Sequence, residues 1–230
     1  MWKVLIGLCA VAILVVLSMA VFPPASASER SVPLPNPAVN ETVAAKSGQE
    51  SMVVAGGCFW GVQAVFQHVK GVVSATSGYA GGNVKSPEYE EVSTGTTGHA
   101  ESVKVVYDPS KITYGELLKI FFSVAHDPTQ LNRQGPDTGT QYRSAIFYAS
   151  DEQKRIAEAY IAQLDQAKVF PKKIVTQVAP LKAFYTAEAY HQDYATLHPD
   201  NPYIRYNDLP KVANLQQQFP DVYQKSIAGH

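Results

Sequence analysis

The order of apolar patterns along the chain constrains its fold more than any other feature. A short apolar run at Met52–Ala55 ends in two glycines, which indicates a buried strand that enters a tight turn. The next stretch, 62–69, places three valines and a phenylalanine on one helical face. The first six predicted elements are strand, helix, strand, strand, helix and strand, which is the β-α-β-β-α-β order of a ferredoxin-like unit. We therefore expect an α+β fold, a two-layer sandwich in which helices cover a mixed sheet.

Two of the predicted helices begin with capping residues. Thr113 with Glu116 three residues later has the pattern of a capping box, and Ser150 with Gln153 opens a helix that runs to about 168. The other expected elements are strands at 72–77, 100–107, 143–149 and 174–179, a glycine-rich turn at 78–82, a polar loop at 126–141, and helices at 186–197 and 212–219.

The first 27 residues have the pattern of a secretory signal peptide. Lys3 precedes an apolar stretch over 4–21, and Ala25-Ser26-Ala27 supplies a small-residue cleavage site. Cleavage after Ala27 predicts export to a periplasm, a lumen or the extracellular space, without stable membrane insertion. The alternative is an uncleaved membrane anchor, because the apolar stretch approaches the roughly 20 residues that a spanning helix needs.

The remaining sequence divides into a linker, one domain and a tail. Residues 28–49 are polar and contain three prolines in alternate positions, so we expect a disordered linker. One domain is expected over 50–220, followed by a C-terminal tail at 221–230. The formal net charge of -1 gives no sign of a nucleic-acid partner.

Cysteine usage singles out Cys58. The chain has two cysteines, and cleavage of the signal peptide removes Cys9, so no internal disulfide is expected. Cys58 lies in Gly-Gly-Cys-Phe-Trp-Gly at 56–61, at or near the first turn of the predicted helix. The helix dipole favours an anion there, so we expect a thiol pKa below the free value of about 8.5 and a reactive nucleophile. The alternative is a small buried hydrophobe.

Glu101 is the candidate proton donor. It shares one face of an alternating strand with Val103 and Val105, so its carboxyl group is expected to face the core. Burial raises the pKa of a carboxyl group and makes it a possible general acid. The alternative, a solvated glutamate at a strand end, fits the residues equally well.

Other polar residues are weaker candidates. Tyr89, Tyr142 and Asp137 lie in polar segments, and neutral tyrosine hydroxyls can donate hydrogen bonds, but in a chain with thirteen tyrosines the residues alone favour packing roles. The histidines lack the close spacing of a zinc site, so no metal site and no bound cofactor are expected. A Cys58–histidine dyad of a hydrolase is a further alternative, although no flanking pattern selects its histidine.

Six motifs, taken together, point to a family. In chain order they are Gly57-Cys58-Phe59-Trp60-Gly61, Gly78-Tyr79-Ala80-Gly81-Gly82, Gly98-His99-Ala100-Glu101, His126-Asp127-Pro128-Thr129-Gln130, Gly139-Thr140-Gln141-Tyr142-Arg143-Ser144 and Ala187-Glu188-Ala189-Tyr190-His191-Gln192-Asp193-Tyr194. With these motifs the chain resembles the class A peptide methionine sulfoxide reductases (MsrA) over about 51–220. The domain at 50–220 is then expected to be a reductase domain that repairs oxidised methionine.

The resemblance implies a role for each candidate residue. Cys58 would attack the sulfoxide sulfur of an S-epimer methionine sulfoxide, free or in a protein, and would become a sulfenic acid. Glu101 would donate the proton to the sulfoxide oxygen. The remaining site residues would bind substrate: Tyr89 and Tyr142 the oxygen, Asp137 the polar side of the site, and Phe59 and Trp60 the S-methyl group.

One departure from the family affects how the enzyme is recycled. Many members carry a second cysteine towards the C-terminus, whereas the region after His191 contains none. The sulfenic acid would therefore need an external thiol reductant, either a thioredoxin-like protein or a small thiol. The same departure leaves open an alternative in which Cys58 serves a redox sensor or sulfoxide-binding protein that does not turn over.

Overall fold

The computed structural model describes residues 34–41 and 48–225 of the chain. The predicted signal peptide and the greater part of the predicted linker lie outside the described residues. Within these two ranges, no helix is both long enough and apolar enough to cross a membrane.

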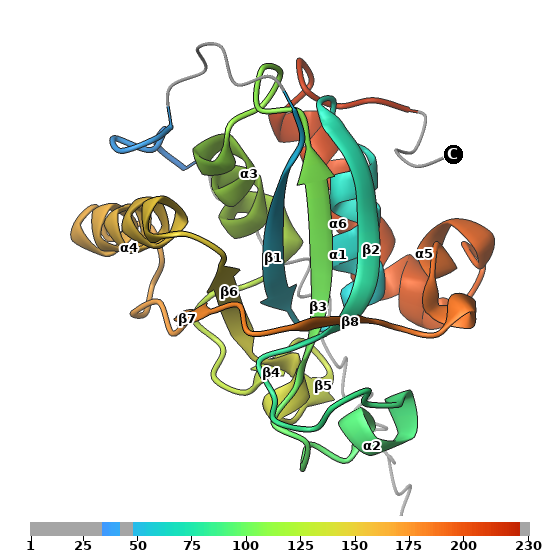
Figure 1. The fold of residues 1–230 in the computed structure, drawn as a ribbon. Coiled ribbons are helices and arrows are strands. Elements are labelled where there is room, and N and C mark those ends of the chain that lie inside the picture. The colour runs from blue at the N-terminus through green and yellow to red at the C-terminus, as the bar shows by residue number, and fades with distance from the viewer. Residues whose placement is uncertain (1–33, 42–47, 226–230) are drawn as a thin grey trace, which may run out of the picture.

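Strands and helices are interspersed along the described chain (Figure 1). The strands are β1 (Glu50–Gly56), β2 (Val72–Ala80), β3 (Ala100–Tyr107), β4 (Arg133–Gln134), β5 (Asp137–Thr138), β6 (Ser144–Tyr148), β7 (Gln177–Pro180) and β8 (Phe184–Thr186). The α-helices are α1 (Phe59–Gln67), α2 (Tyr89–Ser93), α3 (Tyr114–Ile120), α4 (Asp151–Gln166), α5 (Tyr194–Leu197) and α6 (Leu209–Gln218). Short 3-10 turns occur at η2 (Thr140–Tyr142) and η3 (Ala189–His191), and π-helical turns at η1 (Phe121–Ala125) and η4 (Ile204–Asp208).

The central sheet confirms the predicted fold class. Its strand order is β7-β6-β1-β3-β2-β8, and β6, β1, β3 and β2 pair in antiparallel fashion. These four are the fourth, first, third and second strands of the predicted β-α-β-β-α-β unit, which is the sheet order of a ferredoxin-like core. A parallel β7 and an antiparallel β8 extend the sheet at its two edges and make it mixed.

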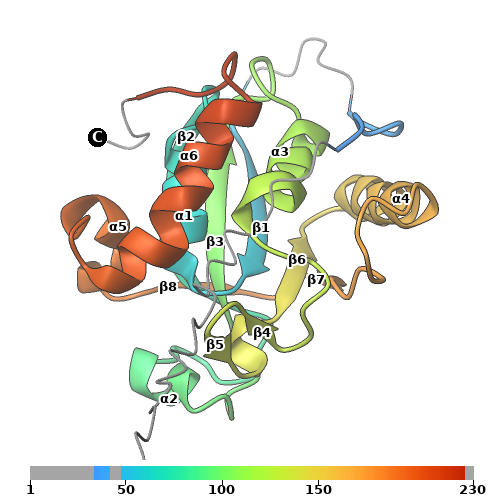
Figure 2. The same cartoon turned by 180° about the vertical axis from the view of Figure 1, so that it is seen from behind.

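The helices cover one face of this sheet. Helices α1, α3 and α6 lie together behind β1, β2 and β3 in Figure 1. In Figure 2, which views the molecule from the opposite side, they lie in front of these strands. The main core lies between these helices and the sheet. On the opposite face the chain between β7 and β8 crosses the sheet, and Leu181 and Phe184 pack against a smaller cluster that contains Val53 and Phe147.

Two local predictions are confirmed residue by residue. The inward face of β3, which carries Glu101, Val103, Val105 and Tyr107, is at most 2% exposed at each position. At the start of α3 the Thr113 hydroxyl accepts a hydrogen bond from the Glu116 backbone, and the Glu116 carboxylate accepts one from the Thr113 backbone at 2.8 Å. The capping box was predictable from neighbouring residues alone, whereas the burial of Glu101 decides an alternative that the strand pattern left open.

The glycine-rich turn predicted at 78–82 is wrong in its first half. Strand β2 continues through Gly78, Tyr79 and Ala80, which pair with β3 on one side and β8 on the other. A Cβ atom on Gly78 would lie 2.3 Å from the Tyr185 carbonyl oxygen, so this glycine permits the close approach of β8. The turn itself begins at Gly81, whose φ is +83°.

The helix predicted at 186–197 is also wrong. The segment contains the end of β8, the turn η3 and the short α5, and Asp193 has a left-handed φ of +58° between the last two. The Gln192 side chain accepts a hydrogen bond from the Ser77 backbone N–H and donates one to the Ser77 carbonyl, both at 3.0 Å. Binding to the edge of β2 thus replaces the continuous helix that periodicity indicated.

Smaller differences concern element boundaries. Strand β7 begins at Gln177, three residues after the predicted start at Ile174, and α6 begins at Leu209, three residues before the predicted Val212. The predicted loop at 126–141 contains the short β4–β5 hairpin. At the predicted tail, residues 221–225 remain close to the end of α1, since Val69 and Tyr223 form an antiparallel bridge.

Residues 34–41, which we call the strap, differ from the disordered linker expected at 28–49. Leu34 is 6% exposed and belongs to the main core, and the Tyr160 hydroxyl of α4 donates a 2.9 Å hydrogen bond to the Pro35 carbonyl. Asn40 and Glu41 accept hydrogen bonds from the first backbone N–H groups of α3. The strap is thus a packed part of the domain, because its few apolar and polar side chains find specific partners on α3 and α4.

Candidate active site

The turn between β1 and α1 fixes the position of Cys58. Gly57 has a φ of +89°, and a Cβ atom there would lie 2.5 Å from the Gln134 side chain, so glycine is required by both the conformation and the space. Cys58 is the N-cap residue of α1. The predicted placement at the helix start is thus confirmed, and the residue is only 8% exposed, so the thiol is nearly buried.

The predicted lowering of the Cys58 pKa is wrong. Burial raises the pKa of the thiol well above its ordinary value, and the nearby carboxylates of Glu101 and Asp208 raise it further. The Trp60 backbone N–H and the Lys211 ammonium oppose this rise without overcoming it. The helix start alone favours a thiolate, but here loss of water and two acidic neighbours have the larger effect. The resting Cys58 is therefore a neutral thiol.

Glu101 lies beside this turn and faces inward, which decides between the two orientations that the sequence left open. It is 2% exposed, and its Oε2 accepts a 3.1 Å hydrogen bond from the Phe59 backbone N–H. Burial raises its pKa to about 8; the Phe59 N–H acts against this rise, while Asp137 and Asp208 add to it. The Glu101 carboxyl group is consequently protonated at neutral pH and can donate a proton next to Cys58.

The two candidate tyrosines come from separate loops. Tyr89 is the first residue of α2 and Tyr142 the last residue of η2. Burial raises the pKa of both phenols, and the charges of Glu101 and Cys58 raise both further. The fold therefore brings these tyrosines into electrostatic reach of the thiol and the acid, as neutral hydroxyl donors.

Asp137 lines the same cavity as Cys58, together with residues of the β4–β5 hairpin, η4 and α6. Its Oδ2 accepts a short hydrogen bond from the Tyr203 hydroxyl. Burial raises the pKa of Asp137, whereas the Tyr203 hydroxyl and Lys211 lower it. The Tyr203 hydroxyl thus holds the Asp137 carboxyl group at the cavity that Cys58 also lines.

The two predicted apolar residues differ in their access to a ligand. Phe59 is 1% exposed and packs against Tyr79, with ring centroids 5.9 Å apart. Trp60 is only partly buried, and its indole stacks on Tyr194 at a centroid distance of 3.9 Å. Trp60 is therefore the more exposed of the two rings, and its centroid lies 6.4 Å from that of Phe59.

Several residues of this site have no strong signal in the sequence. Asp208 is fully buried and its Oδ1 lies 3.4 Å from the Lys211 Nζ; a Cβ atom on Gly61 of α1 would lie 2.1 Å from the same Oδ1. Burial raises the pKa of Asp208 to about 6, and Lys211 counteracts that rise. The only local sequence signal for this ion pair is the spacing of three residues between Asp208 and Lys211. Tyr203, Glu188 and His191 were likewise not assigned a role.

No metal site emerges from this geometry. In the ranges that the structure describes, no three or more histidine, cysteine, aspartate or glutamate residues are grouped so that they could hold a metal ion. His126 is instead part of a buried network: its Nε2 contacts the Ser144 hydroxyl at 2.7 Å, and burial lowers the pKa of the imidazole to about 3.

Known proteins match this chain over nearly all of the described domain. The family model of peptide methionine sulfoxide reductase matches residues 50–223. The peptide methionine sulfoxide reductase MsrA 2 of Mesorhizobium japonicum is 64% identical over 181 residues, which cover 79% of this chain and 93% of that protein. The enzyme of the same name from Synechocystis is 51% identical over 190 residues, or 82% of this chain and 89% of that protein.

Solved structures agree with the sequence matches. Reduced Mxr1 from Saccharomyces cerevisiae superposes with a TM-score of 0.60 at 36% identity and covers 66% of this chain and 87% of its own. Methionine sulfoxide reductase A of Corynebacterium diphtheriae superposes with a TM-score of 0.58 at 38% identity and covers 74% and 84%, respectively. From its sequence and its fold alike, this chain belongs to the peptide methionine sulfoxide reductase family.

Proposed function

We propose that the chain reduces methionine S-sulfoxide, free or in proteins, with Cys58 as the nucleophile and Glu101 as the general acid. One observation carries this proposal: a buried thiol lies next to a carboxyl group whose pKa is raised to about 8, at the turn where the Phe59 N–H contacts Glu101. A sulfoxide sulfur becomes electrophilic when its oxygen is protonated, so the reaction needs a sulfur nucleophile beside a protonated acid.

The first half-reaction balances within this pair. The Cys58 sulfur attacks the sulfoxide sulfur while Glu101 gives its proton to the sulfoxide oxygen, and the thiol proton restores Glu101. The sulfur–oxygen bond of the substrate breaks, and the oxygen becomes bonded to Cys58 as a sulfenic acid. The substrate sulfur gains two electrons and leaves as methionine, while the Cys58 sulfur loses two.

Substrate binding follows from the surrounding side chains. Tyr89 and Tyr142, kept neutral by burial and nearby carboxylates, donate hydrogen bonds to the sulfoxide oxygen. Asp137 orders the polar side of the cavity, and the partly exposed Trp60, backed by Phe59, accepts the S-methyl group.

The second half-reaction requires a thiol from outside the chain, because no cysteine follows Cys58. One thiol attacks the sulfenic acid, releases water and forms a mixed disulfide with Cys58. A second thiol attacks that disulfide, releases the oxidised reductant and returns Cys58 to its thiol form. A small thiol or a thioredoxin-like protein can supply both equivalents.

We propose further that the chain is exported, on the strength of the signal-peptide pattern over residues 1–27. Cleavage after Ala27 leaves a protein without a stable membrane insertion. Retention of the apolar segment as an anchor is the competing outcome, and N-terminal sequencing of the protein from its native host distinguishes them.

The alternative of a redox sensor gains no support. Sensor cysteines are accessible and have a lowered pKa, whereas Cys58 is 8% exposed and has a raised one. A cysteine hydrolase is also unsupported, since the buried His126 and His191 are engaged by Ser144 and Trp60.

The deciding experiment follows the two epimers of racemic methionine sulfoxide separately, with excess dithiothreitol as the reductant. Catalytic loss of the S epimer alone, absent in Cys58→Ser, is the expected result. Consumption of neither epimer by a folded protein with a titratable Cys58 would overturn the proposal. Turnover that persists in Cys58→Ser would show that Cys58 is not the nucleophile.

A further inference from the structure

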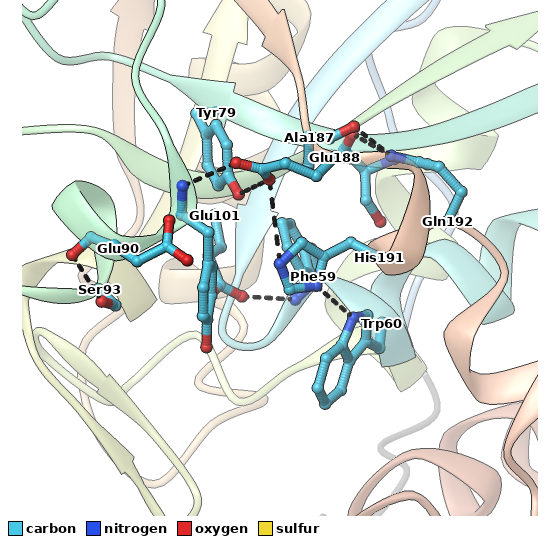
Figure 3. Close-up of polar contacts among 12 residues, drawn as sticks. Phe59, Trp60, Tyr79, Glu90, Ser93, Glu101, Ala187, Glu188, His191 and Gln192 are labelled. Carbon is cyan, nitrogen blue, oxygen red and sulfur yellow. Dashed lines mark hydrogen bonds and ion pairs between the residues drawn. The ribbon is translucent and has the colours of Figure 1, made fainter.

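Two residues without a role in the proposed reaction contact the proposed substrate-binding residues Trp60 and Tyr89. Glu188 and His191 lie three residues apart between β8 and α5, and Figure 3 shows them at the centre of a set of polar contacts. We propose that both are positioning residues: His191 orients the Trp60 indole, and Glu188 holds the start of α2, which carries Tyr89. This inference rests on the proposed function, because the roles of Trp60 and Tyr89 in substrate binding belong to that function.

The contact between Trp60 and His191 defines the state of the histidine. The indole Nε1–H donates to the His191 Nδ1 at 3.2 Å, so that nitrogen must be unprotonated. His191 is 2% exposed, and burial lowers its pKa, which favours the neutral ring. The proton of the neutral ring is then on Nε2, which lies 4.0 Å from the Glu188 Oε2 and has no hydrogen-bond partner among the described residues.

Glu188 therefore favours the tautomer that the indole needs. A distance of 4.0 Å is too long for a hydrogen bond, but the carboxylate still attracts the Nε2–H dipole. A second proton on His191 would occupy Nδ1 and break the bond to Trp60. Four titratable groups face this ring: Glu188 and Glu90 raise its pKa, and the phenols of Tyr89 and Tyr190 pack against it.

The His191 ring also lies between the apolar and polar parts of the site. Its centroid is 5.0 Å from that of Phe59, 5.8 Å from that of Trp60 and 4.5 Å from that of Tyr89. A change in the orientation of His191 would consequently move both the proposed methyl pocket and a proposed oxygen donor.

Glu188 holds the other end of this arrangement. Its Oε1 accepts a 2.8 Å hydrogen bond from the Tyr89 backbone N–H, and its Oε2 accepts one from the Tyr79 hydroxyl at 2.8 Å. The five-residue helix α2 has no side-chain cap of its own, so Glu188 supplies an acceptor for its first residue. Tyr79 is paired with Glu101 in the β2–β3 ladder. The Glu188 carboxylate therefore connects α2 to the pair of strands that carries Glu101.

Kinetics of two His191 variants give the first test. His191→Phe keeps a ring but removes the acceptor, and we expect the KM for methionine S-sulfoxide to rise about tenfold at saturating dithiothreitol, with little change in kcat. His191→Asn retains an acceptor near the position of Nδ1, so it should restore most of the affinity. An unchanged KM in His191→Phe would overturn the positioning role.

Tryptophan fluorescence gives a second test that needs no turnover. The chain has two tryptophans, so Trp2→Phe in the full chain leaves Trp60 as the reporter. In a Cys58→Ser background we expect one fluorescence transition with a midpoint below the ordinary histidine value of about 6.5, because burial lowers the His191 pKa. His191→Asn should abolish it, and Glu188→Gln should move it to lower pH by removing the charge that stabilises the imidazolium.

These readouts separate the inference from the proposed function. A transition that persists in His191→Asn would show that the indole reports another group and would overturn the inference. If the wild-type chain fails to reduce either epimer, the proposed function fails, and the fluorescence titration still decides whether His191 holds Trp60. Thermal unfolding of each variant identifies any that simply fail to fold.

Discussion

The candidate active site has two walls built in different ways. The strand wall consists of Cys58, Phe59, Trp60 and Glu101, which lie on or beside β1, α1 and β3. The C-terminal wall consists of Glu188, His191, Tyr203 and Asp208, which lie between β8 and α6, and of Lys211 in the first turn of α6. Backbone ladders and one helix position the first wall, whereas side-chain hydrogen bonds and a buried ion pair position the second.

This difference assigns different tasks to the two walls. The strand wall holds the atoms proposed to react, because a sheet fixes backbone positions with little freedom. The C-terminal wall adjusts them: Asp208 raises the pKa of Cys58, Lys211 lowers it, and Tyr203 binds Asp137. We therefore expect substitutions in the strand wall to remove activity and those in the C-terminal wall to shift affinity and pH dependence.

The largest effect is expected from Glu101→Gln in the strand wall. Loss of the general acid should slow methionine formation in a single turnover by about 10²- to 10⁴-fold. In the wild type the active form is protonated, and its pKa is raised to about 8, so the single-turnover rate should fall as the pH rises through about 8. The variant should lack this fall. Rapid-quench measurements from pH 6 to 10 would refute the acid role if the two profiles coincide.

The next effect is expected from the buried ion pair of the C-terminal wall. Lys211→Met leaves Asp208 buried without its cation, which should lower the free energy of unfolding by about 3 kcal/mol. Because Lys211 lowers the Cys58 pKa and Asp208 raises it, alkylation of Cys58 should require higher pH in Lys211→Met and lower pH in Asp208→Asn. Alkylation midpoints that move in the same direction in both variants would contradict this account.

A smaller effect is expected from Tyr203→Phe. This change removes the hydroxyl that donates to Asp137, so kcat/KM for methionine S-sulfoxide should fall about fivefold, as for the loss of one hydrogen bond. Tyr206→Phe is the matched control, because Tyr206 lines the same cavity but is 78% exposed. Equal losses in the two variants would mean that the Tyr203–Asp137 bond has no particular importance.

The smallest effect on activity is expected from the strap, which belongs to neither wall. Asn40 accepts a 3.0 Å hydrogen bond from the Gly115 N–H and donates one of 2.8 Å to the Thr113 hydroxyl. Asn40→Ala should lower the free energy of unfolding by about 1 kcal/mol and leave kcat/KM unchanged. Chemical denaturation and steady-state kinetics on one preparation test both parts, and a loss of activity without a loss of stability would be the opposite of the expected result.

The sequence predicted the strand wall well because its signals are local. Alternation along 100–107 gave an inward Glu101 as one of two equal alternatives, and the glycines before Cys58 marked the turn. The same local reasoning failed for the C-terminal wall. Periodicity at 186–197 predicted a helix, but hydrogen bonds between Gln192 and the backbone of β2 hold this segment in another conformation. Periodicity carries no information about which distant strand edge a side chain will meet.

The pKa of Cys58 shows the same limit within the strand wall. Its place at the start of α1 was predictable, and a helix start by itself favours a thiolate. The larger influences are burial and the carboxylates of Glu101 and Asp208, which approach only after folding. The position of Cys58 at the helix start was thus predictable from the sequence, whereas the protonation state of its thiol was not.

The neutral, buried thiol of Cys58 affects how readily the protein is inactivated by oxidants. Peroxides and alkylating agents react with thiolates far faster than with thiols, and they need access to the sulfur. A cysteine that is 8% exposed and protonated at rest offers them neither. In the proposed mechanism its reactivity depends instead on a bound sulfoxide, which takes the proton of Glu101 and leaves that carboxylate to receive the thiol proton. Such a catalyst can persist under the oxidising conditions that generate its substrate, since its thiol becomes reactive only when methionine sulfoxide binds.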